Sequence, residues 1–229
     1  MNALQGLIGL FFPDVCLACG SLLTRGESSV CLSCNFLMPK TAYETIPDNP
    51  VARIFWGRVP LHAASACYFF AKKGRIQPLI HSLKYRSNKG IGLYLGQQLG
   101  TSLIEAPLYQ DVQLIVPVPL HPKKKHIRGY NQAEVIANGM AKVMKLPVVT
   151  DNLIRSVATE TQTKKSRDER WQNVKNIFTV TNPSQFTNSH VLLVDDVITT
   201  GSTIEACVTT LLEATHLKVS VATVACATV

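Results

Sequence analysis

The chain has 229 residues, enough for one substantial hydrophobic core and a small appendage. Hydrophobic residues make up 46% of it and charged residues 17%, which is typical of a folded protein and excludes a disordered tail. The formal net charge of +8 favours an anionic partner, which leaves phosphorylated metabolites, nucleic acid and anionic membrane surfaces open.

The first residues, MNALQGLIGLFFP, are apolar, but no segment reaches the length of about 18 apolar residues that a membrane span needs. The segment lacks a basic start and a small-residue cleavage pattern, so we do not expect a signal peptide. Its large apolar residues recur at helical spacing and predict a short helix that packs on the domain. A membrane-surface anchor is the alternative.

Four cysteines form two C-x2-C pairs with eleven residues between them: Cys16, Cys19, Cys31 and Cys34. Two thiolates this close at a tight turn bind one side of a tetrahedral Zn²⁺, and the second pair completes the site. Two disulfides are the alternative, which a reducing compartment disfavours. Because four sulfur ligands leave no open coordination position, we expect a structural zinc module over residues 1–45. A Pro-rich, polar segment at residues 39–50 then leads into a second domain over residues 46–229.

Strand and helix patterns follow each other after the cysteines. We predict strands over residues 63–71 and 114–118, and helices over residues 76–84, 91–103 and 133–144. Asn131 and Glu134 supply a cap for the last of these helices. Lys84, Tyr85 and Arg86 at the end of the first helix either contact a phosphate or form a solvated helix end.

A basic stretch, PVPLHPKKKHIRGYNQ, joins the second strand to the third helix. A Gly-containing loop at this position is a potential anion site, because it presents fixed positive charge through Arg128. The lysine run from Lys123 to Lys125 is also typical of a solvated surface.

Residues 153–178 are polar in the middle and have no clear apolar period, which predicts a mobile loop. Residues 178–181 predict a returning strand, and residues 218–225 predict a final parallel strand.

The most informative stretch of the chain is VLLVDDVITTGST, from Val191 to Thr203. Its apolar run predicts a buried parallel strand that ends before Asp195. An apolar stripe after the stretch predicts a helix, and Ser202 with Glu205 predicts the cap at its start.

A strand, two carboxylates and a helix start in this order predict a site for a sugar phosphate. The positive helix end and free backbone N–H groups meet at small residues, which suits a phosphate: Thr199, Thr200, Gly201, Ser202 and Thr203. Asp195 and Asp196 are then placed to accept hydrogen bonds from the sugar hydroxyls. An ordinary strand-to-helix turn with solvated aspartates is the alternative.

This stretch closely resembles the phosphoribosyl-pyrophosphate (PRPP) loop of type I phosphoribosyltransferases. The resemblance implies an α/β fold, with a mostly parallel sheet flanked by helices. It implies that Asp195 and Asp196 bind the ribose hydroxyls, that residues 199–203 bind the 5′-phosphate, and that a flexible hood over residues 153–178 excludes water. It also implies Mg²⁺ bound with PRPP and a pyrophosphate loop at Arg128, Gly129 and Tyr130.

Nearly the whole chain resembles the competence protein ComF family, which includes ComFC-like and GntX-like proteins. The cysteine pairs and the stretch from PVP to RGYNQ carry this resemblance, together with Arg155, Thr159, Gln162, Arg170, Asn173 and Phe178. The resemblance implies a bacterial, cytoplasmic protein with a role in natural transformation, where it handles incoming single-stranded DNA.

Three functions remain open. The protein is a phosphoribosyltransferase, a non-catalytic sensor that binds a phosphoribosyl compound in the same pocket, or an adaptor that binds single-stranded DNA or a helicase partner. No residue stands out as a catalytic base. Transfer from PRPP depends mainly on positioning and electrostatic support, so this observation does not exclude an enzyme.

Overall fold

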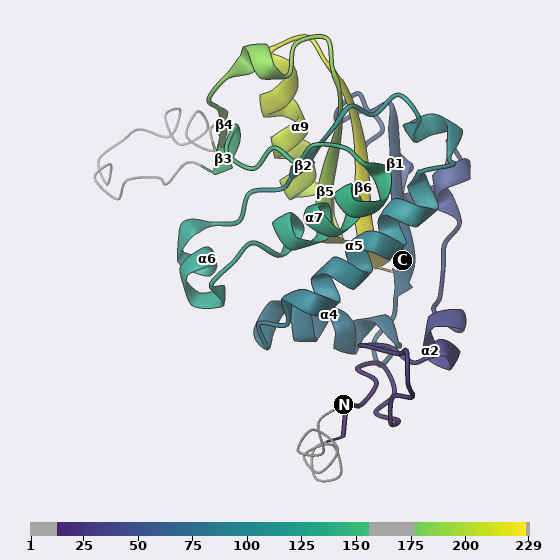
Figure 1. The fold of residues 1–229 in the computed structure, drawn as a ribbon. Helices are drawn as coiled ribbons and strands as arrows, with labels where there is room; N and C mark the ends of the chain where they lie inside the picture. The colour runs from purple at the N-terminus through teal and green to yellow at the C-terminus, as the bar shows by residue number, and fades with distance from the viewer. Residues whose placement is uncertain (1–12, 156–176, 228–229) are drawn as a thin grey trace.

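A parallel sheet of four strands forms the centre of the protein (Figure 1). The computed structural model describes residues 13–155 and 177–227, so the helix expected near the N-terminus lies outside the described residues. The strands are β1 (Ala63–Phe70), β2 (Leu114–Pro117), β5 (His190–Ile198) and β6 (Lys218–Ala227). They lie in the order β1-β6-β5-β2 and every pairing is parallel, which confirms the expected α/β architecture.

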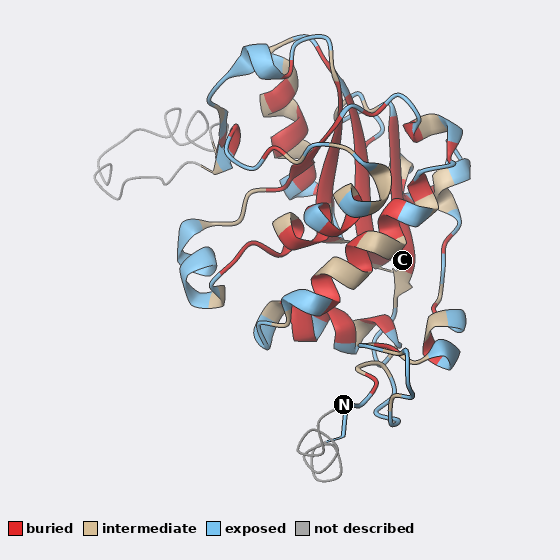
Figure 2. Ribbon diagram, in the orientation of Figure 1, coloured by how far each residue is buried: buried red, intermediate tan, exposed pale blue. Residues whose placement is uncertain are grey.

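Helices cover both faces of this sheet. Against one face lie α4 (Ile76–Tyr85), α5 (Lys89–Leu103) and α7 (Gln132–Met144); against the other lie α3 (Pro50–Arg53) and α9 (Ser202–Ala214). Because side chains alternate along a strand, β5 sends Leu192 and Val194 into the first core and Val191 and Leu193 into the second. Figure 2 shows that buried residues fill the strands and the helix faces turned toward them.

Helices α5 and α7 approach each other closely through glycines. A Cβ atom on Gly96 would lie 2.1 Å from the carbonyl oxygen of Ile136, and one on Gly139 would lie 2.4 Å from that of Leu93. Neither distance is possible for real atoms, so both positions require a residue without a side chain. This contact fixes α7 against the sheet just after the basic stretch.

Shorter elements complete the described chain. They are the helices α2 (Leu32–Phe36) and α6 (Pro122–Arg128), the 3-10 helices η1 (Tyr43–Thr45), η2 (Pro107–Tyr109) and η3 (Pro183–Gln185), and an antiparallel pair formed by β3 (Leu153–Arg155) and β4 (Phe178–Val180).

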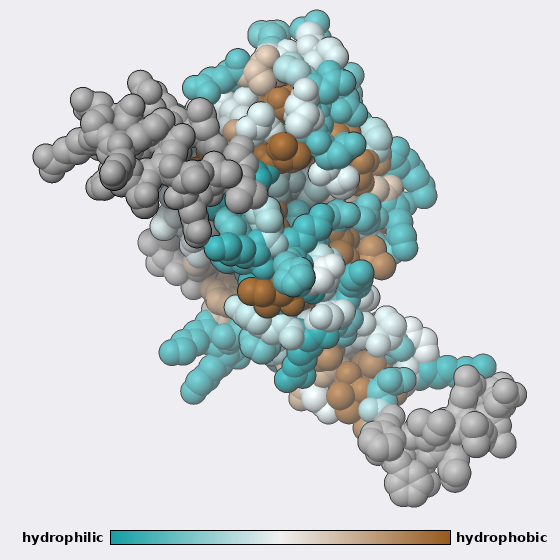
Figure 3. Space-filling view, turned by 90° about the vertical axis from the view of Figure 1, so that its left-hand side faces the viewer, coloured by the Kyte–Doolittle hydropathy of each residue, from teal (hydrophilic) through white to brown (hydrophobic). Residues whose placement is uncertain are grey.

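The N-terminal cysteine module packs on the α4 and α5 side of the sheet. Its buried residues join that core: Cys16, Val30, Cys34 and Met38. The Tyr94 hydroxyl of α5 donates a hydrogen bond of 2.7 Å to the Asn35 side chain of α2. Hydrophobic side chains gather at the lower end of the molecule, where this module lies (Figure 3). On α2, Leu32 and Phe36 are largely exposed.

The basic stretch was expected to be a loop, and this expectation is wrong for its middle, which forms α6. The His121 side chain accepts a hydrogen bond from the amide of Lys123, and Pro122 occupies the first turn, where its missing N–H costs nothing. Gly129 ends the helix in the left-handed region with a φ of 77°. Local start and stop signals therefore outweigh the repulsion among neighbouring lysines.

The strand carrying the two aspartates is longer than the sequence predicted. Strand β5 continues past Val194 to Ile198, because β6 pairs with it as far as the partners Ile198 and Cys226. Asp195 and Asp196 therefore lie within the end of the strand. Residues 153–155, expected in a mobile loop, form β3; the rest of that expected hood, residues 156–176, lies outside the described residues.

Two histidines meet at the amino-terminal edge of the sheet. His190 begins β5 and is only 4% exposed, with its Nε2 2.8 Å from the Ser220 hydroxyl oxygen. Its Nδ1 is buried and has no hydrogen-bond partner among the described residues. The His62 ring meets it edge-on, with ring centroids 5.0 Å apart. Burial, followed by the charges of His62 and Lys218, lowers the pKa of His190 to about 4.

We predict that acid destabilises the protein through His190. Below its ordinary pKa of about 6.5 the unfolded chain binds a proton there that the folded chain takes up only near pH 4. The contribution of His190 to the free energy of unfolding is therefore fully present above pH 6.5. It falls as the pH drops toward 4, by up to about 3 kcal/mol at about 1.4 kcal/mol per pH unit. Urea unfolding at several pH values measures this in the wild type and in His190→Asn. The variant should lose much of the dependence, and an unchanged dependence would contradict the prediction.

Candidate functional site

A cleft of about 670 Å³ opens at the carboxyl ends of the strands. In an open parallel sheet this edge collects the groups that follow each strand. The cleft is lined by the ends of β1 and β5, by α4, by the basic stretch and by the start of α9; its residues include Phe70, His81, Lys84, Arg128, Asp196 and Thr203. Polar groups that are far apart in sequence thus share one cavity.

The loop from Thr199 to Thr203 forms a smaller recess of about 50 Å³ that adjoins this cleft. Gly201 has a φ of 75°, a conformation that favours glycine, and it turns the chain from β5 into α9. The Thr200 and Ser202 hydroxyl oxygens lie 3.1 Å apart beside it. The residues expected to bind a phosphate, Thr199 to Thr203, thus all line one recess at the start of a helix.

The cap expected at the start of α9 is wrong. Gly201 is the N-cap residue, no side chain caps the helix, and the Glu205 carboxylate instead contacts Arg58. Glu205 thus forms an ion pair with a residue far away in the sequence instead of the local capping contact that its spacing from Ser202 predicted. The N–H groups at this helix start are consequently left without a side-chain acceptor, which is the state that suits a phosphate.

The two aspartates differ in their surroundings. The Asp195 carboxylate accepts a hydrogen bond of 2.8 Å from the backbone N–H of Asp196. Burial and the neighbouring Asp196 charge raise the pKa of Asp195 to about 7. Asp196 is 8% exposed and forms an ion pair with Lys84, whose Nζ lies 3.0 Å from its Oδ1. The two neighbouring carboxyl groups thus differ in their partners: Asp195 is bonded to the backbone, and Asp196 to a lysine of another helix.

Helix α4 contributes a polar face, of which the sequence indicated only the end, from Lys84 onward, as a candidate phosphate contact. Gln77, His81 and Lys84 all line the cleft. Their spacing of four and three residues places them on one side of the helix, while Leu79, Ile80 and Leu83 are buried: this spacing was the available signal. The ion pair between Lys84 and Asp196 could not be predicted from the sequence, because it depends on how α4 packs across the sheet.

Of the three residues expected in a pyrophosphate loop, Arg128 lines the cleft, while Gly129 and Tyr130 shape the chain beside it. Arg128 lines the cleft and donates a hydrogen bond of 2.7 Å to the Gln132 side chain. Gly129 ends α6, as described above. Tyr130 is 7% exposed and its hydroxyl donates to the carbonyl oxygen of Leu83, so it ties the basic stretch to α4. Lys84, Lys124 and Arg128 also line a basic recess of about 250 Å³.

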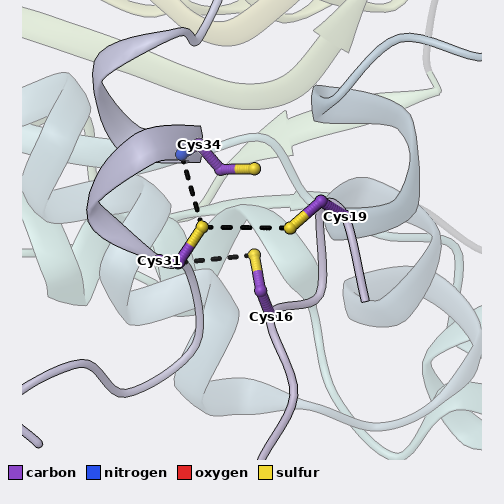
Figure 4. A group of neighbouring side chains, drawn as sticks. All are labelled: Cys16, Cys19, Cys31 and Cys34. Carbon is purple, nitrogen blue, oxygen red and sulfur yellow. Dashed lines mark hydrogen bonds between the residues drawn. The ribbon is translucent and has the colours of Figure 1, made fainter. Parts of the chain in front are cut away.

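The four cysteines of the N-terminal module converge in space (Figure 4). Their Sγ atoms all lie within 4.8 Å of one another, and the cysteines are free thiols rather than disulfides. The Cys16 Sγ accepts a hydrogen bond of 3.3 Å from the Cys31 N–H. Hydrogen bonds with Ser21 lower the pKa of Cys19 to about 6, which favours the thiolate form that binds metals. The donor set and its spacing are compatible with a bound metal ion such as zinc.

Comparisons with known proteins agree with this geometry. A family model for the phosphoribosyl transferase domain matches residues 131–229. The DNA utilization protein YhgH of Escherichia coli K12 is 29% identical over 206 residues, 85% of this chain and 89% of that protein. Competence protein F of Haemophilus influenzae is 34% identical over 130 residues, 55% of this chain and 57% of that protein.

Competence protein ComFC of Bacillus subtilis is 25% identical over 208 residues, 89% of this chain and 81% of that protein. No helix in the described part of the chain is long and apolar enough to cross a membrane. The resemblance expected from the sequence is confirmed: the chain is similar to competence protein F, ComFC and the YhgH-type DNA utilization proteins, and its residues 131–229 match a phosphoribosyl transferase domain.

Proposed function

We propose that the protein binds PRPP or a related ribose 5-phosphate compound in the cleft and serves the uptake and use of DNA in the cytoplasm. The observation that carries this proposal is the uncapped start of α9 beside the Asp195 and Asp196 carboxylates. A phosphate accepts hydrogen bonds where a ribose donates them, so one ligand satisfies both halves of the site.

The ligand is oriented by the order of the strands. The loop after β5 takes the 5′-phosphate, and Asp195 and Asp196 take the ribose hydroxyls. Strand β2 adjoins β5, so the basic stretch that follows β2 lies beside them and supplies Arg128 and Lys124 for the diphosphate. Mg²⁺ bound with PRPP would add charge that stabilises the diphosphate.

Transfer of the phosphoribosyl group fits this arrangement. The bond from the ribose C1 to a diphosphate oxygen breaks, the diphosphate leaves with the electron pair, and a nucleophile forms the new bond at C1. The residues of the cleft position the sugar and offset the charge of the leaving group, which are the main demands of such a step. A sensor that binds the same ligand without transfer uses the same contacts, and the cleft does not identify an acceptor.

A second candidate function is an adaptor that binds single-stranded DNA or a helicase. The exposed basic helix α6 and the exposed Tyr85 ring favour it, with the Arg128 guanidinium 5.6 Å from that ring. Basic residues that follow a nucleic-acid backbone next to an aromatic surface for base stacking are typical of single-strand binding. The two functions share Lys124 and Arg128, which line the cleft, whereas Lys123 and Lys125 line neither the cleft nor the phosphate loop, as we call residues 199–203.

We propose further that Cys16, Cys19, Cys31 and Cys34 hold one structural Zn²⁺. Four thiolates would complete its coordination, so the metal would stabilise the fold of the module and take no part in a reaction.

Ribose 5-phosphate binding tests the cleft. The double variant Asp195→Ala, Asp196→Ala should bind at least about tenfold more weakly, because charge-assisted hydrogen bonds of about 1.5–3 kcal/mol are removed. Gly201→Val should also weaken binding, since a Cβ there meets Ile54 at 2.8 Å and Phe55 at 3.0 Å and displaces the loop. Asp111→Ala, at the opposite edge of the sheet, is the control. Calorimetry that gives equal affinities for all four proteins would place the ligand elsewhere.

Metal analysis tests the cysteine module. Protein purified without added zinc should contain one Zn²⁺ per chain, and Cys34→Ser should lose the metal and melt at a lower temperature. Cys67→Ser changes a buried cysteine outside the cluster and should keep the metal. Absence of zinc in the wild type, or its retention in Cys34→Ser, would refute the assignment.

Transformation frequency in a naturally transformable host separates the two candidate functions. If the cleft is required, the double aspartate variant should lose transformation while it stays folded and metal-loaded. If DNA binding is the main role, that variant should transform normally. Replacing Lys123, Lys124 and Lys125 by Ala should then weaken single-strand binding and reduce its salt dependence, by about 0.7 in log–log slope for each DNA phosphate that is no longer neutralised. We expect the cleft to be required, so normal transformation by the folded aspartate variant would contradict us.

A further inference from the structure

Residues 54–58 contact the phosphate loop on the side away from the cleft, and they lie outside residues 131–229, which match the family model. Arg58, which follows α3, donates hydrogen bonds of 2.9 Å to the Thr200 carbonyl oxygen and 3.0 Å to the Ile54 carbonyl oxygen. Its other terminal nitrogen donates to the Glu205 carboxylate in the first turns of α9. Both side chains of this ion pair are about one-third exposed, at 32% each.

Packing supports the same contact. The Gly201 Cα faces Ile54 and Phe55, because a Cβ on it would approach their side chains to 2.8 Å and 3.0 Å. Phe55 is 1% exposed, so this segment is part of the core. Asn49 anchors it by donating a hydrogen bond of 2.8 Å to the Ala64 carbonyl of β1. The residues that touch the loop from this side do not line the cleft, so they act on the loop from its far side.

Glu205 would oppose phosphate binding if it were free. It lies in the first turn of α9, where a free carboxylate is attracted to the unbonded N–H groups of the helix start. In that position it would occupy an N–H group that the phosphate needs and would place a negative charge beside it. The ion pair with Arg58 turns the carboxylate away and compensates its charge.

We propose that Arg58 is a positioning residue that keeps the phosphate loop open. It holds the Thr200 carbonyl in place and withdraws Glu205 from the start of α9, which leaves the loop amides to an incoming phosphate. This inference rests on the proposed binding of ribose 5-phosphate compounds. Arg58 itself touches no ligand and acts only through Thr200 and Glu205.

A double-mutant cycle tests this role with ribose 5-phosphate as the probe. Arg58→Ala should bind about tenfold more weakly, a size typical of coupled neighbours, and adding Glu205→Ala should recover most of that loss. A merely structural role for Arg58 predicts no recovery. Arg53→Ala is the matched control, because it breaks an exposed ion pair with Asp48 (2.6 Å) on the same segment and should leave the affinity unchanged.

Two further measurements keep the outcomes distinct. If Arg58→Ala does not fold, as judged by melting, Arg58→Gln keeps a donor for Thr200 but has no charge to hold Glu205, so it should show a smaller loss that Glu205→Ala again recovers. Hydrogen exchange of the Gly201, Ser202 and Thr203 amides needs no ligand. Exchange should slow in Arg58→Ala, where Glu205 caps the helix, and return to the wild-type rate in the double variant.

Each result has one meaning. Wild-type protein that does not bind ribose 5-phosphate overturns the proposed function, and the exchange rates then decide the role of Arg58 alone. Wild-type affinity in folded Arg58→Ala, or a double variant that binds no better than Arg58→Ala, overturns the inference while the proposed function stands.

Discussion

Strand β5 is held on both sides by parallel neighbours, and this pairing determines where every group of the cleft lies. Its four apolar residues from Val191 to Val194 are fully buried, and each such side chain contributes about 1.5–3 kcal/mol to folding. The hydrogen-bonded ladder to β6 continues past them to Ile198. Asp195 and Asp196 are therefore fixed by the sheet itself, which keeps two adjacent carboxylates largely out of water in spite of their mutual repulsion. A free loop would let them separate and hydrate.

The cleft combines two kinds of chemistry. Carboxylates at the end of β5 accept hydrogen bonds from hydroxyl groups, while Lys84, Lys124 and Arg128 attract anions. A ligand that carries both hydroxyls and phosphates matches this combination, whereas a plain polyanion would be repelled by the aspartates. Lys123 and Lys125 of α6 do not line the cleft and are exposed, so they suit a nucleic-acid backbone better. The two candidate functions thus use adjoining surfaces that share Tyr85, Lys124 and Arg128.

Most of the fold could be predicted because its signals are local. The buried strand, the small-residue loop and the helix after it follow from apolar patterns over a few residues, and so do the helices of the first half. Helix α6 carried readable signals as well, in Pro122 at its start and Gly129 at its end, but its dense charge suggested a loop. The contacts that complete the site could not be predicted. Lys84 with Asp196, and Arg58 with Glu205, join residues far apart in sequence, and the second pair overrides a capping rule that the local sequence satisfies.

The strand order has a consequence for how the chain is made. Both edge strands of the central sheet, β1 and β2, lie before residue 118, and the two central strands, β5 and β6, lie after residue 189. Because β1 and β2 do not pair with each other, a ribosome exposes both as unpaired apolar strands until the last segment of the chain has emerged. Until β5 and β6 follow, the apolar side chains and backbone hydrogen-bonding groups of β1 and β2 are open to contacts with other chains, which is the condition that favours aggregation.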